Sequence, residues 1–244
     1  MKFEQYKPLF DAFHLRGREL YAVGGCVRDA LLGLQPKDFD FCTDAQPEEV
    51  KLVMNELGAN VIDKLGGNYG TVHTIYNGEN IEITTYRVDK DYPAGDRRPV
   101  VEFSNKLRDD LVRRDFTINA IAARITVDGG LAIEAREPVC VQGWQDLKRG
   151  YLTSPQDPRK LMSDDPLRIL RMYRFAAKYN LTIDQDLRMA VRAYAAHLKF
   201  VSRERIQDEL KKISGGPQPH NAFRWMMEDG VMTHLFPELR KQVG

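Results

Sequence analysis

The chain has 244 residues, of which 43% are hydrophobic and 29% are charged, so it is long enough for one or two globular domains with a substantial core. No apolar run approaches the roughly 20 residues of a membrane span, and the first residues lack the apolar stretch of a signal peptide. The three cysteines form no Cys-x-x-Cys pair, which argues against a zinc site or a disulfide framework and indicates reduced thiols in a cytoplasmic protein. The five histidines are scattered, and we assign them no catalytic role.

The net charge of +1 hides an uneven distribution. Residues 1–135 contain 17 Lys and Arg against 22 Asp and Glu, a net charge of −5, whereas residues 136–244 contain 19 against 13, a net charge of +6. An acidic half that binds metal, joined to a basic half that binds a polyanion, would produce this asymmetry. Chance variation between two solvated surfaces would produce it equally well.

The first elements lead into a stretch with an unusual arrangement of glycines and acids. Residues 2–17 have apolar positions at helical spacing, which predicts a helix with one face on a sheet. Residues 21–23 predict a short strand that ends at Gly24 and Gly25, and residues 27–33 predict a helix. Residues 38–41 (DFDF) alternate acid and aromatic, so in a strand Asp38 and Asp40 lie on one face and the two phenylalanines lie on the other.

Two carboxylates on one strand face repel each other, and each raises the pKa of the other unless a cation lies between them. Mg²⁺ takes one or two carboxylates and completes its shell with water and substrate phosphates. The glycines at the start of the following helix leave backbone N–H groups available for an anion. This combination predicts metal-assisted phosphoryl or nucleotidyl transfer. The alternative is a solvated strand face beside an ordinary strand-to-helix turn.

The middle of the chain predicts a helix over residues 47–57, a short strand over 60–63, and two strands over 70–76 and 80–87 joined at Asn77-Gly78 as a hairpin. Glu82 is a candidate third carboxylate for the metals, or else an exposed strand acid. Residues 87–103 are charged, contain glycine and prolines and lack periodicity, which predicts a mobile loop that is either functional or an inert surface loop.

Residues 107–125 (LRDDLVRRDFTINAIAARI) combine charge with helical spacing. We expect Asp109 and Asp110 to cap a short turn, and Thr117 to cap a helix over residues 118–124 with Ile118, Ile121 and Ile125 turned inward. The charged residues 113–115 would lie at the polar N-terminal end of that helix. Ionised side chains beside a helix start are able to bind phosphates and a ribose hydroxyl.

From residue 161 onward the pattern is helical. Asp164 is expected to cap a helix that has Pro166 in its first turn and ends at Tyr179. Further helices are expected over residues 184–199, 202–214 and 219–229, and two glycines followed by proline separate the last two.

Asp165 and Arg168 are three residues apart, so their side chains project from one face of this helix. A carboxylate accepts hydrogen bonds and a guanidinium donates them, which matches the amino donor and ring-nitrogen acceptor of cytosine and adenine. Guanine and uracil present the reverse order, and each buried group left unpaired costs about 1–3 kcal/mol. The alternative is a surface ion pair worth a few tenths of a kcal/mol.

These motifs together resemble a known family. A strand followed by Gly-Gly and then by Asp-hydrophobic-Asp resembles the polymerase-beta-type nucleotidyltransferase superfamily. Over residues 20–240 the chain is similar to class II tRNA CCA-adding enzymes and bacterial poly(A) polymerases, in GGCVRDALLG (24–33), KDFDF (37–41), RRDFTINA (113–120), GWQDLKRG (143–150), DDPLR (164–168) and SRERIQDEL (202–210). The loop residues 96–99 (DRRP) also resemble the flexible loop of these enzymes. DDPLR departs from the family's EDxxR in having Asp164 where the family has Glu.

The resemblance implies an α+β fold, with a small mixed-sheet nucleotidyltransferase head over residues 1–142 that has flanking helices, followed by an all-α neck over residues 143–244. It also implies template-independent transfer of CMP and AMP from CTP and ATP to the 3′ end of tRNA, with release of pyrophosphate. Asp38 and Asp40 would be catalytic and would bind two Mg²⁺ ions. The implied nucleotide-binding residues are Gly24, Gly25 and Arg28 for the triphosphate, Arg114 and Asp115 for the ribose, Asp165 and Arg168 for the base, and Asn119, Arg171 and Arg174.

Three other functions share these motifs. A poly(A) polymerase and a partial A-adding or CC-adding enzyme have the same catalytic residues, although the flexible loop argues against a CC-adding enzyme. A non-catalytic RNA-binding module would incorporate no nucleotide. Family members usually continue into body and tail domains that hold the tRNA elbow, and because this sequence ends at Gly244 we expect it to lack those domains, either as a piece of a longer protein or as a short form that holds only the acceptor end. None of these observations predicts an oligomeric state.

Overall fold

The computed structural model describes residues 3–62, 69–90 and 100–238. The chain forms two compact units, residues 1–145 and residues 146–244. The first contains the sheet and the second is mainly helical, so the expected α+β class is confirmed. Within the described ranges, no helix is both long enough and apolar enough to cross a membrane.

In the part of the first unit that the structure describes, seven strands form one mixed sheet in the order β3-β4-β5-β2-β1-β8-β9. Their bounds are β1 Leu20–Val23, β2 Phe39–Thr43, β3 Asn60–Ile62, β4 Thr71–Tyr76, β5 Glu79–Thr85, β8 Ala122–Ile125 and β9 Leu131–Ile133. β2 and β5 run parallel, and the other neighbours run antiparallel. The predicted hairpin is confirmed: β4 and β5 are joined by Asn77 and Gly78, both with positive φ as a type I′ turn requires.

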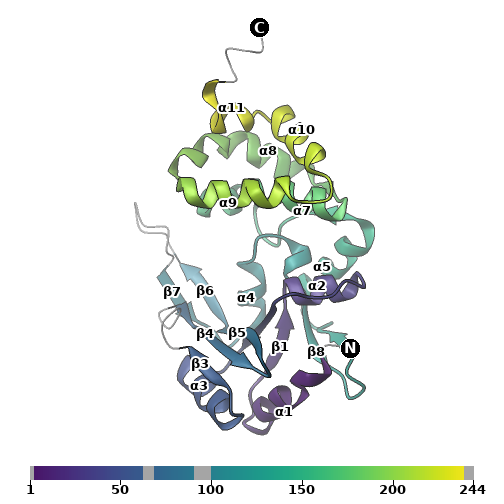
Figure 1. Cartoon of the computed structure of the whole chain (residues 1–244), viewed down its shortest axis with the longest axis vertical. Coiled ribbons are helices and arrows are strands. Elements are labelled where there is room, and N and C mark those ends of the chain that lie inside the picture. The colour runs from purple at the N-terminus through teal and green to yellow at the C-terminus, as the bar shows by residue number, and fades with distance from the viewer. Residues whose placement is uncertain (1–2, 63–68, 91–99, 239–244) are drawn as a thin grey trace. The chain divides into compact units, whose positions relative to one another are not determined.

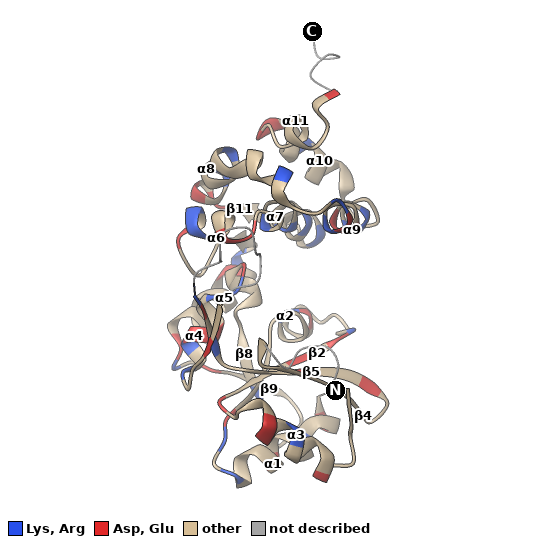
Figure 2. Cartoon of the chain, turned by 90° about the vertical axis from the view of Figure 1, so that its left-hand side faces the viewer, with Lys and Arg blue, Asp and Glu red and all other residues tan. Residues whose placement is uncertain are grey.

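Helices cover both faces of this sheet. They are η1 (Glu4–Tyr6), α1 (Lys7–Leu15), α2 (Gly25–Leu31), α3 (Pro47–Glu56), α4 (Leu107–Val112), η3 (Thr117–Asn119) and α5 (Pro138–Arg149). α1 and α3 lie together on one side of the sheet, and α2 lies on the other (Figure 1, Figure 2). The helices expected at the N-terminus, after the glycines and after residue 46 are therefore confirmed.

An aromatic cluster joins β2 to the N-terminal helices. The ring of Tyr6 lies 4.8 Å from that of Phe39 and 5.2 Å from that of Phe41, and Phe3 meets Phe39 edge-on at 5.2 Å. All four rings are almost completely buried. Because side chains alternate along a strand, burying the two phenylalanines on this face turns the intervening carboxylate of Asp40 to the opposite face.

The helix expected over residues 118–124 is wrong. Residues 117–119 form one 3₁₀ turn, after which β8 begins, and Ala122 and Ala123 pair with Val23 and Ala22 of β1. Ile118 and Ile121 are buried as expected, but pairing with a central strand overrides the helical spacing of the apolar residues. Phe116 precedes this turn as its N-cap, and Thr117 is the first residue of the turn itself.

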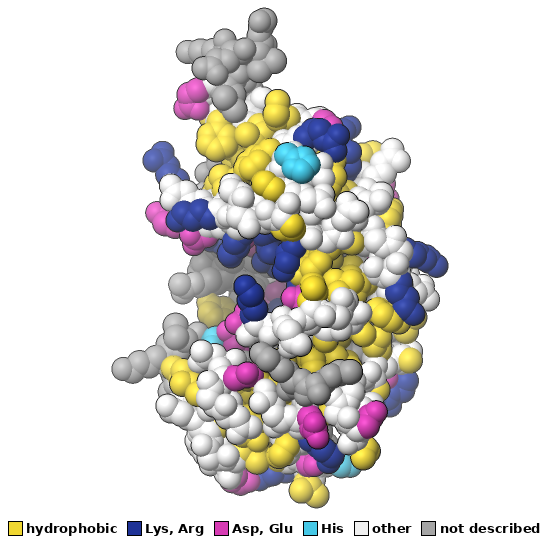
Figure 3. Space-filling view, turned by 45° about the vertical axis from the view of Figure 1, so that its right-hand side comes forward, with side chains coloured by type: hydrophobic (Ala, Val, Ile, Leu, Met, Phe, Trp, Pro, Cys, Tyr) yellow, Lys and Arg dark blue, Asp and Glu magenta, His cyan; other side chains and the backbone are white. Residues whose placement is uncertain are grey.

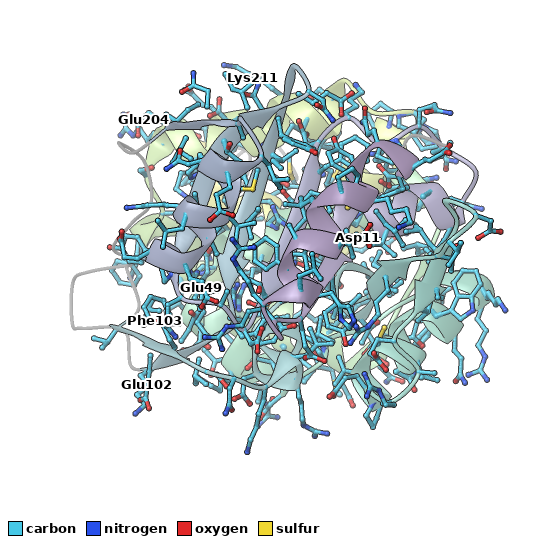
Figure 4. The ribbon with its side chains drawn as sticks, turned by 90° about the horizontal axis from the view of Figure 1, so that it is seen from below. Asp11, Glu49, Glu102, Phe103, Glu204 and Lys211 are labelled. Carbon is cyan, nitrogen blue, oxygen red and sulfur yellow. The ribbon has the colours of Figure 1, made fainter. Side chains whose placement is uncertain are left out.

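The loop expected over residues 87–103 is also wrong at both ends. β6 (Arg87–Lys90) and β7 (Val100–Phe103) pair antiparallel in a separate ribbon, with Arg87 opposite Phe103. Glu102 and Phe103 lie together on β7, and the Phe103 ring lies so close to Gly70 that a Cβ there would be 2.5 Å away (Figure 4). Residues 91–99, including the DRRP motif, lie outside the described residues.

The second unit contains β10 (Tyr151–Leu152), α6 (Pro158–Asp164), α7 (Leu167–Tyr179), β11 (Thr182–Ile183), α8 (Gln185–Tyr194), η4 (Ala195–Phe200), α9 (Arg203–Ser214), α10 (Pro219–Glu228) and α11 (Met232–Leu235). Over residues 161–238 the expected helical pattern is confirmed except at β11, which pairs parallel with β10. α6 packs on α8, and α7 packs on α9 and α10. Residues of η4, α9 and α11 line a groove of about 520 Å³, and hydrophobic side chains gather on this unit (Figure 3).

Asp164 does not cap α7, contrary to the prediction. It is the last residue of α6, and the chain is extended at Asp165, as is favoured before a proline. The Asp165 carboxylate instead accepts a hydrogen bond from the backbone N of Leu167 at 3.2 Å. Within the helical core, the buried Asp229 carboxylate binds the Tyr173 hydroxyl at 2.9 Å and Nε of Arg192 at 2.9 Å, which ties α7 and α8 to the end of α10.

The close packing of Gly143 in α5 predicts that a side chain at this position lowers the stability of the protein. A Cβ there would lie 2.1 Å from the carbonyl oxygen of Thr117, a backbone atom that cannot rotate away. Gly143→Ala should lower the free energy of unfolding by about 1–3 kcal/mol, although alanine is the better helix former. Urea denaturation measures the change, with Gly215→Ala as the control because its nearest contact is 3.3 Å. Equal or higher stability of Gly143→Ala would contradict the close packing.

Candidate active site

A row of side chains crosses four neighbouring strands on the sheet face opposite α1. Asp40 on β2 is opposite Glu82 on β5, Glu82 is opposite His73 on β4, and His73 is opposite Ile62 on β3. Neighbouring strands are roughly 4.8 Å apart, so these side chains lie next to one another. Together with Asp38 they line a cavity of about 260 Å³. The structure therefore brings Asp38 and Asp40 into one cavity with Glu82, the candidate third carboxylate, and adds His73, which was not predicted.

Burial and neighbouring charges both change the pKa of Asp40 in this cavity. Burial raises the pKa of Asp40, the positive charge of Arg114 lowers it, and the negative charges of Glu82 and Asp38 raise it, which together bring it to about 6. The Nδ1 atom of His73 lies 3.2 Å from Oε1 of Glu82. A carboxyl whose pKa is raised by burial, in a cavity that other titratable groups line, is characteristic of a functional site.

The glycine turn brings the end of β1 close to Arg114. Gly24 has φ 75° and ψ −127°, a conformation that disfavours other residues, and its N–H donates to the carbonyl of Ile121 at 3.1 Å. A Cβ at Gly24 would lie 3.1 Å from Nη1 of Arg114. Gly25 begins α2. A glycine is therefore required for the close approach of the Arg114 guanidinium.

A chain of hydrogen bonds joins three predicted nucleotide-binding residues. Arg28 donates through Nη1 to Oδ1 of Asn119 and through Nε to Oδ1 of Asp29 at 2.8 Å. Asn119 donates through Nδ2 to Oδ1 of Asp115 at 2.9 Å. Arg28, Asp115 and Asn119 are all buried, so the network holds each polar group in a defined orientation.

Asp110 has a role that the sequence did not indicate. Asp110 was predicted to cap a turn, but its side chain is completely buried. Its Oδ2 accepts a hydrogen bond from Nη2 of Arg114 at 2.8 Å, and its Oδ1 accepts one from Nε of Arg113 at 2.9 Å. Burial raises the pKa of the Asp110 carboxyl, but the two guanidinium groups outweigh it and hold that pKa below its ordinary value. Asp110 therefore holds the guanidinium of Arg114 close to Gly24. The spacing of an acid three and four residues before two arginines was the available signal.

In the second unit, α7 presents a stripe of arginines. Arg168, Arg171 and Arg174 recur every three residues and are partly exposed, while the apolar positions between them are buried. The Arg174 guanidinium pairs with the buried Glu209 and lies 4.2 Å from the centre of the Phe175 ring. Glu209 thus fixes one end of the stripe.

At the other end of the stripe, the Asp165 carboxylate pairs with Nη2 of Arg205 on α9 at 2.8 Å. Nη1 of Arg168 donates to the carbonyl of Leu161 at 3.3 Å. Asp165 and Arg168, which were predicted to read the base, thus lie at the N-terminal end of α7, and the predicted nucleotide-binding residues Arg171 and Arg174 follow along the same helix. Contacts with α9 orient Asp165 and Arg174, and these contacts were not predicted.

Two protein families match parts of the chain. Residues 20–153 match the family described as poly A polymerase head domain, and residues 180–242 match the family described as probable RNA and SrmB-binding site of polymerase A. The CCA-adding enzyme of Lactobacillus helveticus is 36% identical over 221 residues, which are 91% of this chain and 52% of that protein. That of Geobacillus sp. is 34% identical over 243 residues, which are 98% of this chain and 55% of that protein.

Solved structures give the same relationship. The crystal structure of the Bacillus stearothermophilus CCA-adding enzyme in complex with CTP has a TM-score of 0.79 and 30% identity, covering 94% of this chain and 52% of that one. The Thermotoga maritima CCA-adding enzyme complexed with tRNA has a TM-score of 0.76 and 28% identity, covering 96% and 52%. The chain thus spans about half the length of the relatives it matches. Because the head-domain match alone covers more than half of its residues, the chain belongs to the poly A polymerase head-domain family, as the sequence motifs predicted.

Proposed function

We propose that this chain carries the catalytic and nucleotide-selecting parts of an enzyme that transfers CMP and AMP from CTP and ATP to the 3′ end of tRNA and releases pyrophosphate. The observation that carries the proposal is the cavity shared by Asp38, Asp40 and Glu82, which lies on the same sheet as the Gly24 turn. The similarity to CCA-adding enzymes whose structures contain CTP or tRNA supports the choice of substrates.

The acids of the cavity fit a divalent cation. Burial and the neighbouring carboxylates raise the pKa of Asp40 to about 6, so a cation would relieve the repulsion among these groups. No group of three or more His, Cys, Asp or Glu side chains in the described ranges is arranged to hold a metal by itself. Mg²⁺ needs only one or two carboxylates beside water and phosphates, so Asp38 and Asp40 would hold it. When bound, Mg²⁺ activates the attacking hydroxyl and stabilises charge on the phosphates.

The remaining groups of the first unit would bind the nucleotide. Gly24 and Gly25, at the start of α2, would bring the backbone close to the triphosphate, and Arg28 would offer it positive charge within a fixed network. Arg114 and Asp115 would bind the ribose, and Asn119, which bonds to both Arg28 and Asp115, would keep their spacing. Asp110 holds Arg114 in advance, so the guanidinium loses little freedom on binding.

Base choice would depend on the second unit. Asp165 accepts and Arg168 donates, a pattern that pairs with cytosine and adenine and opposes guanine and uracil. The ion pair of Asp165 with Arg205 leaves the carboxylate with further lone pairs for a base amino group. Arg171 and Arg174, on the same stripe, would add positive charge next to the nucleotide. A poly(A) polymerase would use the same pair for adenine alone, so the nucleotides must be tested separately.

The decisive experiment incubates the chain with tRNA that lacks its 3′ end, Mg²⁺ and each nucleotide in turn, and reads the added bases on a gel. CTP and ATP should be incorporated, and UTP and GTP should not. Asp38→Ala should lower the rate by about 100-fold or more, as does loss of a preorganised electrostatic group, without unfolding the protein. Asp11→Ala, an exposed acid on α1, is the matched control. Full activity of Asp38→Ala would defeat the metal assignment.

Arg168→Ala tests the base selection. Removing the donor should reduce the preference for CTP and ATP over UTP and GTP by about 5-fold to 150-fold, which corresponds to 1–3 kcal/mol for an unpaired buried group. The ratio of kcat/KM values for the four nucleotides measures the effect. Lys178→Ala, an exposed residue of the same helix, should leave the ratios unchanged. A variant that loses Arg168 and keeps the wild-type preference would exclude its role.

The pKa of Asp40 predicts how metal-free stability depends on pH. Its pKa of about 6 in the folded protein exceeds the ordinary value of 3.8, so the folded state binds the proton more tightly and loses stability as pH rises through 6. Asp40→Asn should therefore be more stable than wild type at pH 8 in EDTA by about 1–3 kcal/mol, and by much less at pH 4. Urea denaturation at both pH values measures this, with Asp11→Asn as the control. A destabilised Asp40→Asn at pH 8 would show that the carboxylate is not strained.

A further inference from the structure

His73 belongs to the carboxylate cavity although no motif of the sequence includes it. It lies on β4 in the row that runs from Asp40 through Glu82, and it lines the same cavity. The two-residue turn at Asn77-Gly78 sets the β4–β5 register, in which Tyr76 faces Glu79 and His73 faces Glu82. The position of His73 is therefore built into the hairpin backbone and does not depend on one side-chain rotamer.

The contact of His73 with Glu82 restrains a side chain that would otherwise move freely. Glu82 is half exposed, and a glutamate at such a position populates several rotamers. The Nδ1 atom of His73 lies 3.2 Å from its Oε1. One carboxylate oxygen of Glu82 is thereby engaged, and the strand register keeps Glu82 next to Asp40.

We propose that His73 is a positioning residue of the carboxylate cavity: by pairing with Glu82 it holds that side chain beside Asp40, where its charge strengthens the binding of a divalent cation. The inference rests on the proposed role of Asp38 and Asp40 as metal ligands. It assigns His73 no contact with the cation. Partners that orient acidic groups in this way commonly change metal affinity about 10-fold to 100-fold when removed. Because the His73–Glu82 pair is partly solvated, the effect should fall at or below the lower end of that range.

Binding of Mn²⁺ to the full chain, followed by the electron paramagnetic resonance signal of the free ion, tests the proposal without relying on activity. His73→Phe keeps a ring of similar size and removes the nitrogen atoms, and it should raise the Kd for Mn²⁺ about 3-fold to 10-fold. His73→Val, which suits a strand, should give the same result. His73→Gln retains an N–H donor and should bind within about twofold of wild type. Thermal unfolding of each variant verifies that it is folded.

A double-mutant cycle shows whether His73 acts through Glu82. Glu82→Gln should weaken Mn²⁺ binding, and adding His73→Phe to it should weaken binding no further. Ile75→Val, two residues along the same strand and outside the cavity lining, is the matched control and should bind as wild type. Additive effects of the two substitutions would overturn the proposal, as would wild-type affinity in His73→Phe or equal losses in His73→Gln and His73→Phe.

The outcome also separates this inference from the proposed function. If Asp38→Ala leaves Mn²⁺ binding unchanged, the proposed metal site is wrong and His73 loses its stated role with it. If Asp38→Ala abolishes binding while His73→Phe binds normally, only the inference about His73 fails. If Mn²⁺ binding follows the expected pattern but no nucleotide is incorporated, the inference stands and the proposed substrates are wrong.

Discussion

The burial of Phe39 and Phe41 against the N-terminal helices is the constraint on which the site depends. Each ring contributes about 1.5–3 kcal/mol by leaving water, and the two occupy alternate positions of β2. A shift of one residue would turn the carboxylates into this apolar layer, at a cost of several kcal/mol for each charge. The aromatic face therefore sets the orientation of Asp38 and Asp40, and the strand pairing then brings Glu82 next to Asp40.

Charge balance provides the second level of organisation. Arg114 is partly buried and has the fully buried Asp110 as its partner, and its positive charge opposes the rise in the pKa of Asp40. A buried charge is tolerated only when it is paired, so this arrangement fixes the guanidinium beside the Gly24 turn. In the helical unit, the buried carboxylate of Asp229 at the end of α10 accepts hydrogen bonds from Tyr173 on α7 and Arg192 on α8. These contacts hold α7, which carries the arginine stripe, in a fixed position.

The parts of the fold that could be predicted are those with a strong local signal. Alternation predicted β2, and Asn77-Gly78 predicted the β4–β5 hairpin, because turn geometry and side-chain period act over a few residues. Residues 118–124 were predicted wrongly as a helix, since pairing of β8 with β1 outweighs their local preference. The strands at the ends of residues 87–103 were missed because they pair with each other across a stretch whose sequence lacks periodicity.

The sequence by itself determined the class of chemistry: acids at alternate strand positions, a glycine turn before a helix, and an acid–arginine pair at helical spacing all act through neighbours in the chain. Only the tertiary structure decided which groups surround those residues. Asp110 proved to be the buried partner of Arg114, and His73 proved to face Glu82. The spacing of Asp110 and Arg114 is visible in the sequence, but the burial of Asp110 and the strand register of His73 depend on packing between distant segments.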